Sequence, residues 1–121
     1  MAKILVVDDD KAIIKTLDML LTSEGHEVIA VSTSSDAINS LNSNIIDLVL
    51  TDIRMPHPDG IELLKMIRKD RPEIPVIMVS AYGSEKTKKD SIDMGCYAYL
   101  AKPFKVNDII NAVNGALGIK Q

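Results

Sequence analysis

Aromatic residues are scarce in this chain of 121 residues, which has no tryptophan, one phenylalanine and three tyrosines. A chain of this length can bury a core of its own, so we expect one domain, residues 1–121, with an aliphatic core. A lone cysteine, Cys96, excludes an internal disulfide and fits a reducing cytoplasm. It stands just before an apolar run, and we interpret it as a small buried residue.

Long apolar runs and an excess of positive charge are also absent. No run reaches the roughly 18 apolar residues of a membrane span, and the chain enters an apolar run almost at its first residue. We therefore expect no membrane attachment and no signal peptide. The formal net charge is −3, and the basic cluster of Lys86, Lys88 and Lys89 is interspersed with acids, as on a solvated helix face. This balance predicts no direct contact with nucleic acid.

The chain alternates five times between short β-rich runs and longer helical patterns. The runs predict strands at 3–7, 27–31, 47–51, 76–80 and 98–100, and helices at 11–24, 36–42, 60–69, 84–94 and 106–117. The first, third and fourth runs are almost continuously apolar, as strands covered on both faces must be. Such short connections imply right-handed βαβ units, and hence an α/β fold with a doubly wound parallel sheet.

The predicted helices carry apolar stripes and recognisable ends. Gly25 supplies a left-handed stop, Pro72 prevents continuation of the third helix, and Ser34 or Ser35 is expected as an N-cap. The side chains that we expect on the inward stripes are Ile13, Ile14, Leu17, Leu20, Leu21, Ile61, Leu64, Ile67, Ile92, Met94, Val106, Ile109, Ile110, Val113 and Leu117.

Four apolar runs end in a polar group: Asp8-Asp9, Asp52, Ser80 and Lys102. If the strands are parallel, these groups meet at one edge of the sheet, where doubly wound folds bind ligands. Helix capping alone can account for Asp10. It does not explain three adjacent acids, because neighbouring carboxylates repel and raise each other's pKa. A hard cation such as Mg²⁺ relieves that repulsion, and a lysine adds a site for an anion.

Asp52 has two interpretations. It can begin a turn before the proline-rich loop that follows, or it can act as a nucleophile at the strand end. Phosphoryl transfer requires mainly positioning and neutralised oxygens, so Mg²⁺ and Lys102 would suffice. Taken singly, Ser80 is equally well explained as the end of a strand, and Lys102 as a surface lysine. Pro103 follows Lys102, and a cis peptide bond costs little at such a position.

Five separated motifs, VVDDD, TDIRMP, DG, VSAY and YLAKPF, occur in order across the chain. Together they resemble the receiver (CheY-like) domain of bacterial two-component response regulators, and are most similar in motif to NtrC-type and Spo0F-type receivers. The resemblance implies a flavodoxin-like (βα)5 fold with strand order 2-1-3-4-5. The loop departs from the usual pattern at His57-Pro58, where many members have a glycine and an apolar residue.

The resemblance also implies roles for individual residues. Asp52 would be the phosphoacceptor, and Mg²⁺ would be held by Asp9, Asp52 and the backbone carbonyl of Arg54, with Asp8 acting largely through water. Ser80 matches the switch serine or threonine, Tyr99 the switch aromatic, and Lys102 the lysine of the family.

The function implied is a signalling domain rather than an enzyme. Such a domain would accept a phosphoryl group from a histidine kinase or a histidine phosphotransfer protein and would switch the face formed by residues 84–117. That face would act on an output domain or a downstream protein, or in a phosphorylation-linked homodimer. Arg54 and Tyr82 should guard the approach of water, and since neither is a base at neutral pH, we expect slow autodephosphorylation.

Three other functions fit part of this pattern. A dehalogenase-type phosphatase also uses a strand-end aspartate with Mg²⁺, but it requires a second aspartate at the position of Arg54. A receiver-like module that is never phosphorylated would not need the complete set of acids, serine and lysine. A flavin-binding module would want a Gly/Ser/Thr-rich loop after the first strand, where three acids would repel the phosphate.

Overall fold

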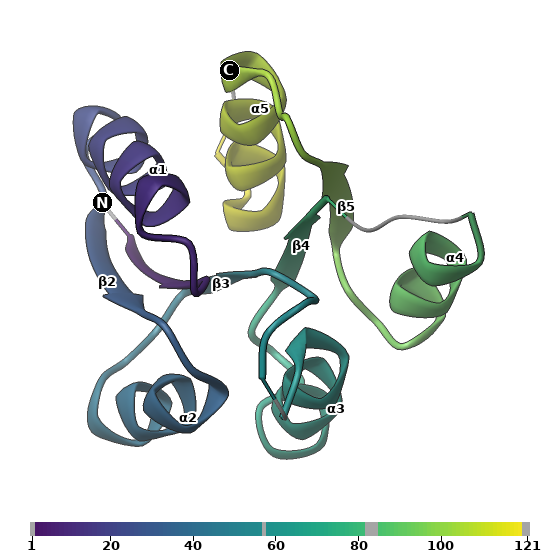
Figure 1. The fold of residues 1–121 in the computed structure, drawn as a ribbon. Coiled ribbons are helices and arrows are strands. Elements are labelled where there is room, and N and C mark those ends of the chain that lie inside the picture. Colours follow the sequence, from purple (N-terminus) through teal and green to yellow (C-terminus); the bar gives the residue numbers. More distant parts are fainter. Residues whose placement is uncertain (1, 57, 82–84, 120–121) are drawn as a thin grey trace.

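The computed structural model describes residues 2–56, 58–81 and 85–119. Within them, strands and helices alternate along the chain (Figure 1). The elements are β1 (Lys3–Val7), α1 (Lys11–Ser23), β2 (Glu27–Val31), α2 (Ser34–Ser43), β3 (Leu48–Thr51), α3 (Gly60–Asp70), β4 (Val76–Ser80), α4 (Glu85–Asp93), β5 (Ala98–Ala101) and α5 (Val106–Leu117). All strand pairs are parallel and the order is β2-β1-β3-β4-β5, which confirms the predicted fold class.

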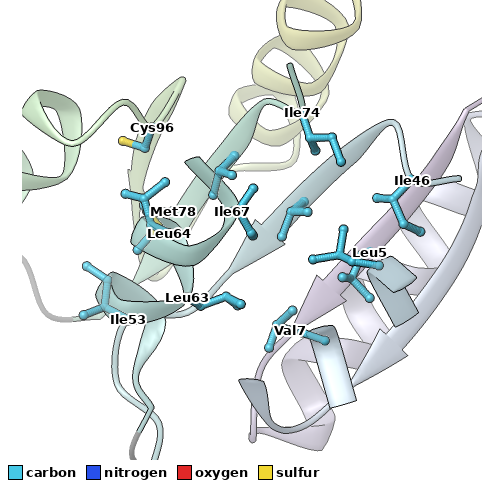
Figure 2. Packing of buried hydrophobic residues seen from close by; sticks show 14 of the residues in the cluster. Leu5, Val7, Ile46, Ile53, Leu63, Leu64, Ile67, Ile74, Met78 and Cys96 are labelled. Carbon is cyan, nitrogen blue, oxygen red and sulfur yellow. The ribbon is translucent and has the colours of Figure 1, made fainter. Parts of the chain in front are cut away.

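The sheet separates two hydrophobic clusters. Helices α1 and α5 cover one face, and α2 and α3 cover the other, where the segment after α4 also packs (Figure 1). Successive side chains of a strand point to opposite faces, so Ile4 and Val6 join the α1–α5 cluster while Leu5 and Val7 join the α2–α3 cluster. Figure 2 shows the second of these, in which Cys96 is buried as predicted.

The start of α2 differs from the prediction. The helix begins at Ser34 rather than at residue 36, and its N-cap is Thr33, whose hydroxyl accepts a hydrogen bond from the backbone N–H of Asp36. The predicted N-cap at Ser34 or Ser35 is therefore wrong. Hydroxyl residues occupy four successive positions here, 32–35, and local propensity does not distinguish among them.

Two predicted inward residues are exposed. Val106 is 52% exposed and Ile92 is 49% exposed, although Ile109 and Val113 of the same α5 stripe are buried. Val106 is the first residue of α5, and α4 lies beside the edge strand β5 (Figure 1), so the sheet covers neither side chain. The buried residue of α4 is Ser91.

The remaining boundaries agree with the prediction or differ from it by one residue. Strand β3 begins at Leu48, and the carboxylate of the preceding Asp47 accepts the backbone N–H of Lys3 at 2.8 Å. Gly25 has φ +89° as predicted for the stop after α1. The predicted start of the fourth helix, at residue 84, falls outside the described residues. None of the described helices combines the length and the apolarity that crossing a membrane requires.

Candidate functional site

The carboxyl ends of four strands bring the predicted polar residues together. Val7 pairs with Thr51, so the next residues, Asp8 and Asp52, lie at the same level of neighbouring strands. Ser80 is the last residue of β4 and pairs with Ala101, which directly precedes Lys102. The predicted convergence at this edge is therefore present, because parallel strands align their carboxyl ends.

Three carboxylates form an acidic cluster at this edge. One oxygen from each of Asp8, Asp9 and Asp52 lies within 4.8 Å of the others. Asp8 and Asp52 are buried and Asp9 is exposed. Asp10 instead caps α1, since its Oδ1 accepts the backbone N–H of Ala12 at 2.9 Å. The capping explanation is thus correct for Asp10 and does not apply to the other three acids.

Asp8 lies at the bottom of the cluster, only 2% exposed. Burial raises its pKa, and the nearby charge of Asp52 raises it further. The hydrogen bonds from Lys102 and from the backbone N–H of Asp10 lower it but do not restore the ordinary value. The ionised form of Asp8 is therefore less stable here than in water, and a bound cation would offset that cost.

Lys102 reaches two of the three acids. Its Nζ lies 2.7 Å from Asp8 Oδ2 and 3.3 Å from Asp52 Oδ2, and its side chain is 13% exposed. Burial lowers its pKa, but the hydrogen bonds and charges of the two carboxylates outweigh that effect, so the net pKa is raised and the ammonium stays charged. The Lys102–Pro103 peptide bond is cis, at the position where the sequence allows it.

Asp52 is held by groups on both of its oxygens. Oδ1 accepts the backbone N–H groups of Ile53 at 2.7 Å and of Arg54 at 3.3 Å, while Oδ2 accepts from Lys102. This arrangement orients the carboxylate and leaves it on the wall of an open cavity of about 480 Å³. The cavity is lined by Asp9, Asp10, Asp52, Arg54, Met55, Pro56, Ala81 and Lys102.

Ser80 and Tyr99 connect the edge of the site to β5. Ser80 is fully buried, and Tyr99 is partly buried against the α2–α3 cluster. Burial raises the Tyr99 pKa, a side-chain hydrogen bond with Ser80 lowers it, and the charge of Asp52 raises it. Tyr99 therefore contacts Ser80 in this structure and lies near enough to Asp52 for that charge to raise the Tyr99 pKa.

Sequence reasoning missed Gly60, the first residue of α3. A Cβ atom there would lie far inside contact distance of the Asp52 carbonyl oxygen and 2.7 Å from Ile53 Cα. The Gly60 N–H also donates to the Ile53 carbonyl at 2.8 Å. The DG motif contains Gly60, but the motif does not indicate that the backbone after Asp52 packs against this residue.

Met55, Pro56 and Ala81 line the cavity, and no chemical feature of these side chains marks them in the sequence as site residues. Tyr82 and His57 fall outside the described residues.

Residues 4–114 match the family described as the response regulator receiver domain. The chain therefore belongs to the receiver domains of two-component response regulators, a class of signalling domains. Nothing in the comparisons supports the dehalogenase-type alternative.

Three similar proteins illustrate the relationship. The transcriptional regulatory protein GlrR of Escherichia coli K12 is 35% identical over 96% of this chain and 26% of its own length. NtrC of Proteus hauseri is 36% identical over 93% of this chain and 24% of its own. The chain thus spans about a quarter of these two regulators. The receiver domain of the Francisella response regulator 1452 matches with a TM-score of 0.91 at 34% identity, over 98% of both chains.

Proposed function

We propose that Asp52 is the residue of this receiver domain that accepts the phosphoryl group. The observation that carries the proposal is that Asp52 both lines the open cavity and accepts hydrogen bonds from Lys102 and from two backbone N–H groups. Asp8 is almost fully buried and does not line the cavity, and Asp10 is engaged as a helix cap. The Asp52 carboxylate is thus both accessible from the cavity and held in a fixed orientation.

The donor set fits Mg²⁺, which prefers one or two carboxylates, a carbonyl and several retained waters. Asp9, Asp52 and the backbone carbonyl of Arg54 would hold the ion, with Asp8 acting through water. Lys102 offsets one of the three negative charges of the cluster, which leaves an excess that a divalent cation would neutralise. When bound, the ion would neutralise the oxygens of the transferring phosphoryl group.

The donor would be a phosphohistidine on a sensor kinase or on a histidine phosphotransfer protein. The P–N bond of the donor breaks as a P–O bond to Asp52 forms. The departing imidazole nitrogen takes a proton from solvent, so that the histidine leaves in its neutral form. Lys102 lies where it can pair with a phosphoryl oxygen, and Ser80 can donate its hydroxyl to another. No base is needed, because a carboxylate nucleophile has no proton to give up when it attacks phosphorus.

Acetyl phosphate provides a direct test of phosphoryl acceptance without a kinase. We expect the protein to gain the mass of one phosphoryl group when Mg²⁺ is present and to gain none in EDTA, as measured by intact mass spectrometry. Equal incorporation with and without the metal would contradict the role of the cation, and no incorporation in either case would contradict the acceptor function.

Replacing Asp9 by alanine is expected to weaken Mg²⁺ binding by more than about tenfold and to slow phosphorylation, because even changes outside the ligand shell commonly cost about 10- to 100-fold in metal affinity. Calorimetric titration with Mg²⁺ measures the effect. Asp10→Ala is the matched control, since it removes a neighbouring acid that serves as a helix cap. An unchanged affinity in Asp9→Ala would point to Asp8 and Asp10 as the important acids.

The phosphoryl group should be long-lived, with a lifetime of minutes or longer rather than seconds. Arg54 lines the cavity and offers donors but no base, and Tyr82 is no base at neutral pH. Replacing Arg54 by asparagine together with Tyr82 by glutamate should shorten the lifetime, because the introduced amide and carboxylate can orient or activate the attacking water. Loss of labelled phosphate measures it. Decay of the double variant at the wild-type rate would show that shielding by these side chains is unimportant.

The readout of phosphorylation is proposed to be the face formed by α4, β5 and α5. Tyr99 links that face to the site through Ser80, and α4 buries little of its surface, so its position should shift easily. Beryllofluoride, which mimics a phosphoryl group, should therefore shift backbone amide resonances at residues 82–105 more than those at residues 11–24. NMR changes restricted to the acid pocket would contradict this switch.

We also propose that residues 1–121 form one receiver domain working in the cytoplasm. Its partners would be a histidine kinase or phosphotransfer protein and an output domain or downstream protein, with homodimer formation linked to phosphorylation. The similarity to GlrR and NtrC supports such a pairing. The net charge of −3 supports the absence of nucleic-acid contacts by this domain.

A further inference from the structure

A hydrogen bond joins α2 to the connection between β3 and α3. The hydroxyl of Ser34 donates to the backbone carbonyl of Pro58 at 2.7 Å, across 24 positions of the chain. Ser34 is only 2% exposed. The capping of α2 is carried out by Thr33, so the Ser34 hydroxyl is not required to begin the helix.

The connection that receives this bond builds one side of the functional site. At its start, the N–H groups of Ile53 and Arg54 hold Asp52 Oδ1. At its end, Asp59 forms a capping box with Glu62 at the start of α3. Pro58 lies between these attachments and has no N–H, so its carbonyl is its one backbone group for hydrogen bonding.

From this arrangement we infer that Ser34 is a positioning residue for the metal and phosphoryl site. Its hydroxyl fixes Pro58, and through Pro58 the path of the backbone that presents the carbonyl of Arg54 and places Met55 on the cavity wall. Small displacements matter here, because a misplacement of about 1 Å can cost about 10²-fold in rate. This role rests on the proposed function of the site.

The structure also separates this role from a general effect on folding. A cavity of about 270 Å³ adjoins Ser34 and Pro58 and is lined by polar Ser35 and Asn39 as well as apolar side chains. Water can therefore replace the lost hydroxyl at the Pro58 carbonyl in a Ser34→Ala variant, and the domain should stay folded. The same cavity offers room for the extra methyl group of a Ser34→Thr variant, which keeps the hydroxyl.

Three variants test the inference: Ser34→Ala, Ser34→Thr, and Ser35→Ala as the matched control on the exposed neighbour. Ser34→Ala should weaken Mg²⁺ affinity by about tenfold, as outer-shell changes commonly do, and slow phosphorylation by acetyl phosphate. Ser34→Thr and Ser35→Ala should remain close to wild type. Hydrogen exchange without metal should be faster at the amides of Arg54 and Met55 in Ser34→Ala only.

The outcomes are distinguishable. If the wild-type protein binds Mg²⁺, and Ser34→Ala and Ser35→Ala bind it with equal affinity, the positioning role of Ser34 is overturned. The proposed function of the site would still stand. Unchanged hydrogen exchange in Ser34→Ala would overturn the tether itself, whatever the metal affinity. A wild-type protein that binds no Mg²⁺ would overturn the proposed function of the site and, with it, this role.

Discussion

Replacing Asp52 by asparagine is expected to abolish phosphorylation while leaving the fold intact. An amide cannot form the acyl phosphate, yet its oxygen can still accept the N–H groups of Ile53 and Arg54. Removing the charge of Asp52 also removes one of the causes that raise the pKa of Asp8, so the remaining Asp8–Lys102 pair should persist. The loss should therefore be chemical rather than structural.

Intact mass spectrometry after incubation with acetyl phosphate and Mg²⁺ measures the effect, with urea unfolding as the check on folding. Asp10→Asn is the matched control, because it makes the same substitution at an acid that caps α1, and asparagine is as good an N-cap as aspartate. This variant should still be phosphorylated. Mg²⁺-dependent incorporation of a stable phosphoryl group into Asp52→Asn would show that another residue is the acceptor.

Replacing Gly60 by alanine is expected to damage both the fold and the site. In most helices this change would increase stability, since alanine has the higher helix propensity. Here the added methyl group would collide with the backbone of Asp52 and Ile53, which cannot move without shifting the carboxylate. We expect a loss of about 1–3 kcal/mol or more in the free energy of unfolding, and phosphorylation slowed by about 10²-fold.

Gly115 of α5 offers the matched control for this prediction. A Cβ atom there would meet the Tyr97 hydroxyl, which is at the end of a side chain that is 52% exposed and free to rotate into solvent. Gly115→Ala should therefore leave the free energy of unfolding unchanged or raise it by up to about 1 kcal/mol. Urea unfolding of both variants gives the comparison. Equal stability of Gly60→Ala and wild type would mean that the β3–α3 connection yields to the methyl group.

Much of the fold could be predicted because burial on both faces leaves a local signature. Leu48, Val49 and Leu50 are all buried, and an apolar run of this kind is what a central parallel strand requires. The stripe of α1 was equally readable, since Leu17 and Leu21 recur at helical spacing. The predicted burial of Val106 and Ile92 was wrong for the converse reason. Periodicity shows which side chains share a helix face, but not whether the sheet covers that face.

The sequence predicted which residues form the site but not which of them form hydrogen bonds with one another. Parallel strands align their ends, so Asp8, Asp52, Ser80 and Lys102 had to meet once the strands were recognised. Whether Lys102 bonds more closely to Asp8 than to Asp52 depends on the depth of each carboxylate and on the rotamer of a long side chain. No local pattern contains that information.

The sequence by itself determined the order of strands and helices along the chain and the chemical groups at the strand ends, because side-chain polarity at short range sets both. The tertiary structure alone decided that Thr33 rather than Ser34 caps α2, that Ser34 binds Pro58, and that no side chain fits at Gly60. Of these features, the Ser34–Pro58 hydrogen bond joins positions 24 residues apart in the chain. The geometry of these features is set by how closely the helices pack on the sheet, and packing distances between distant segments have no counterpart in the local pattern of residues.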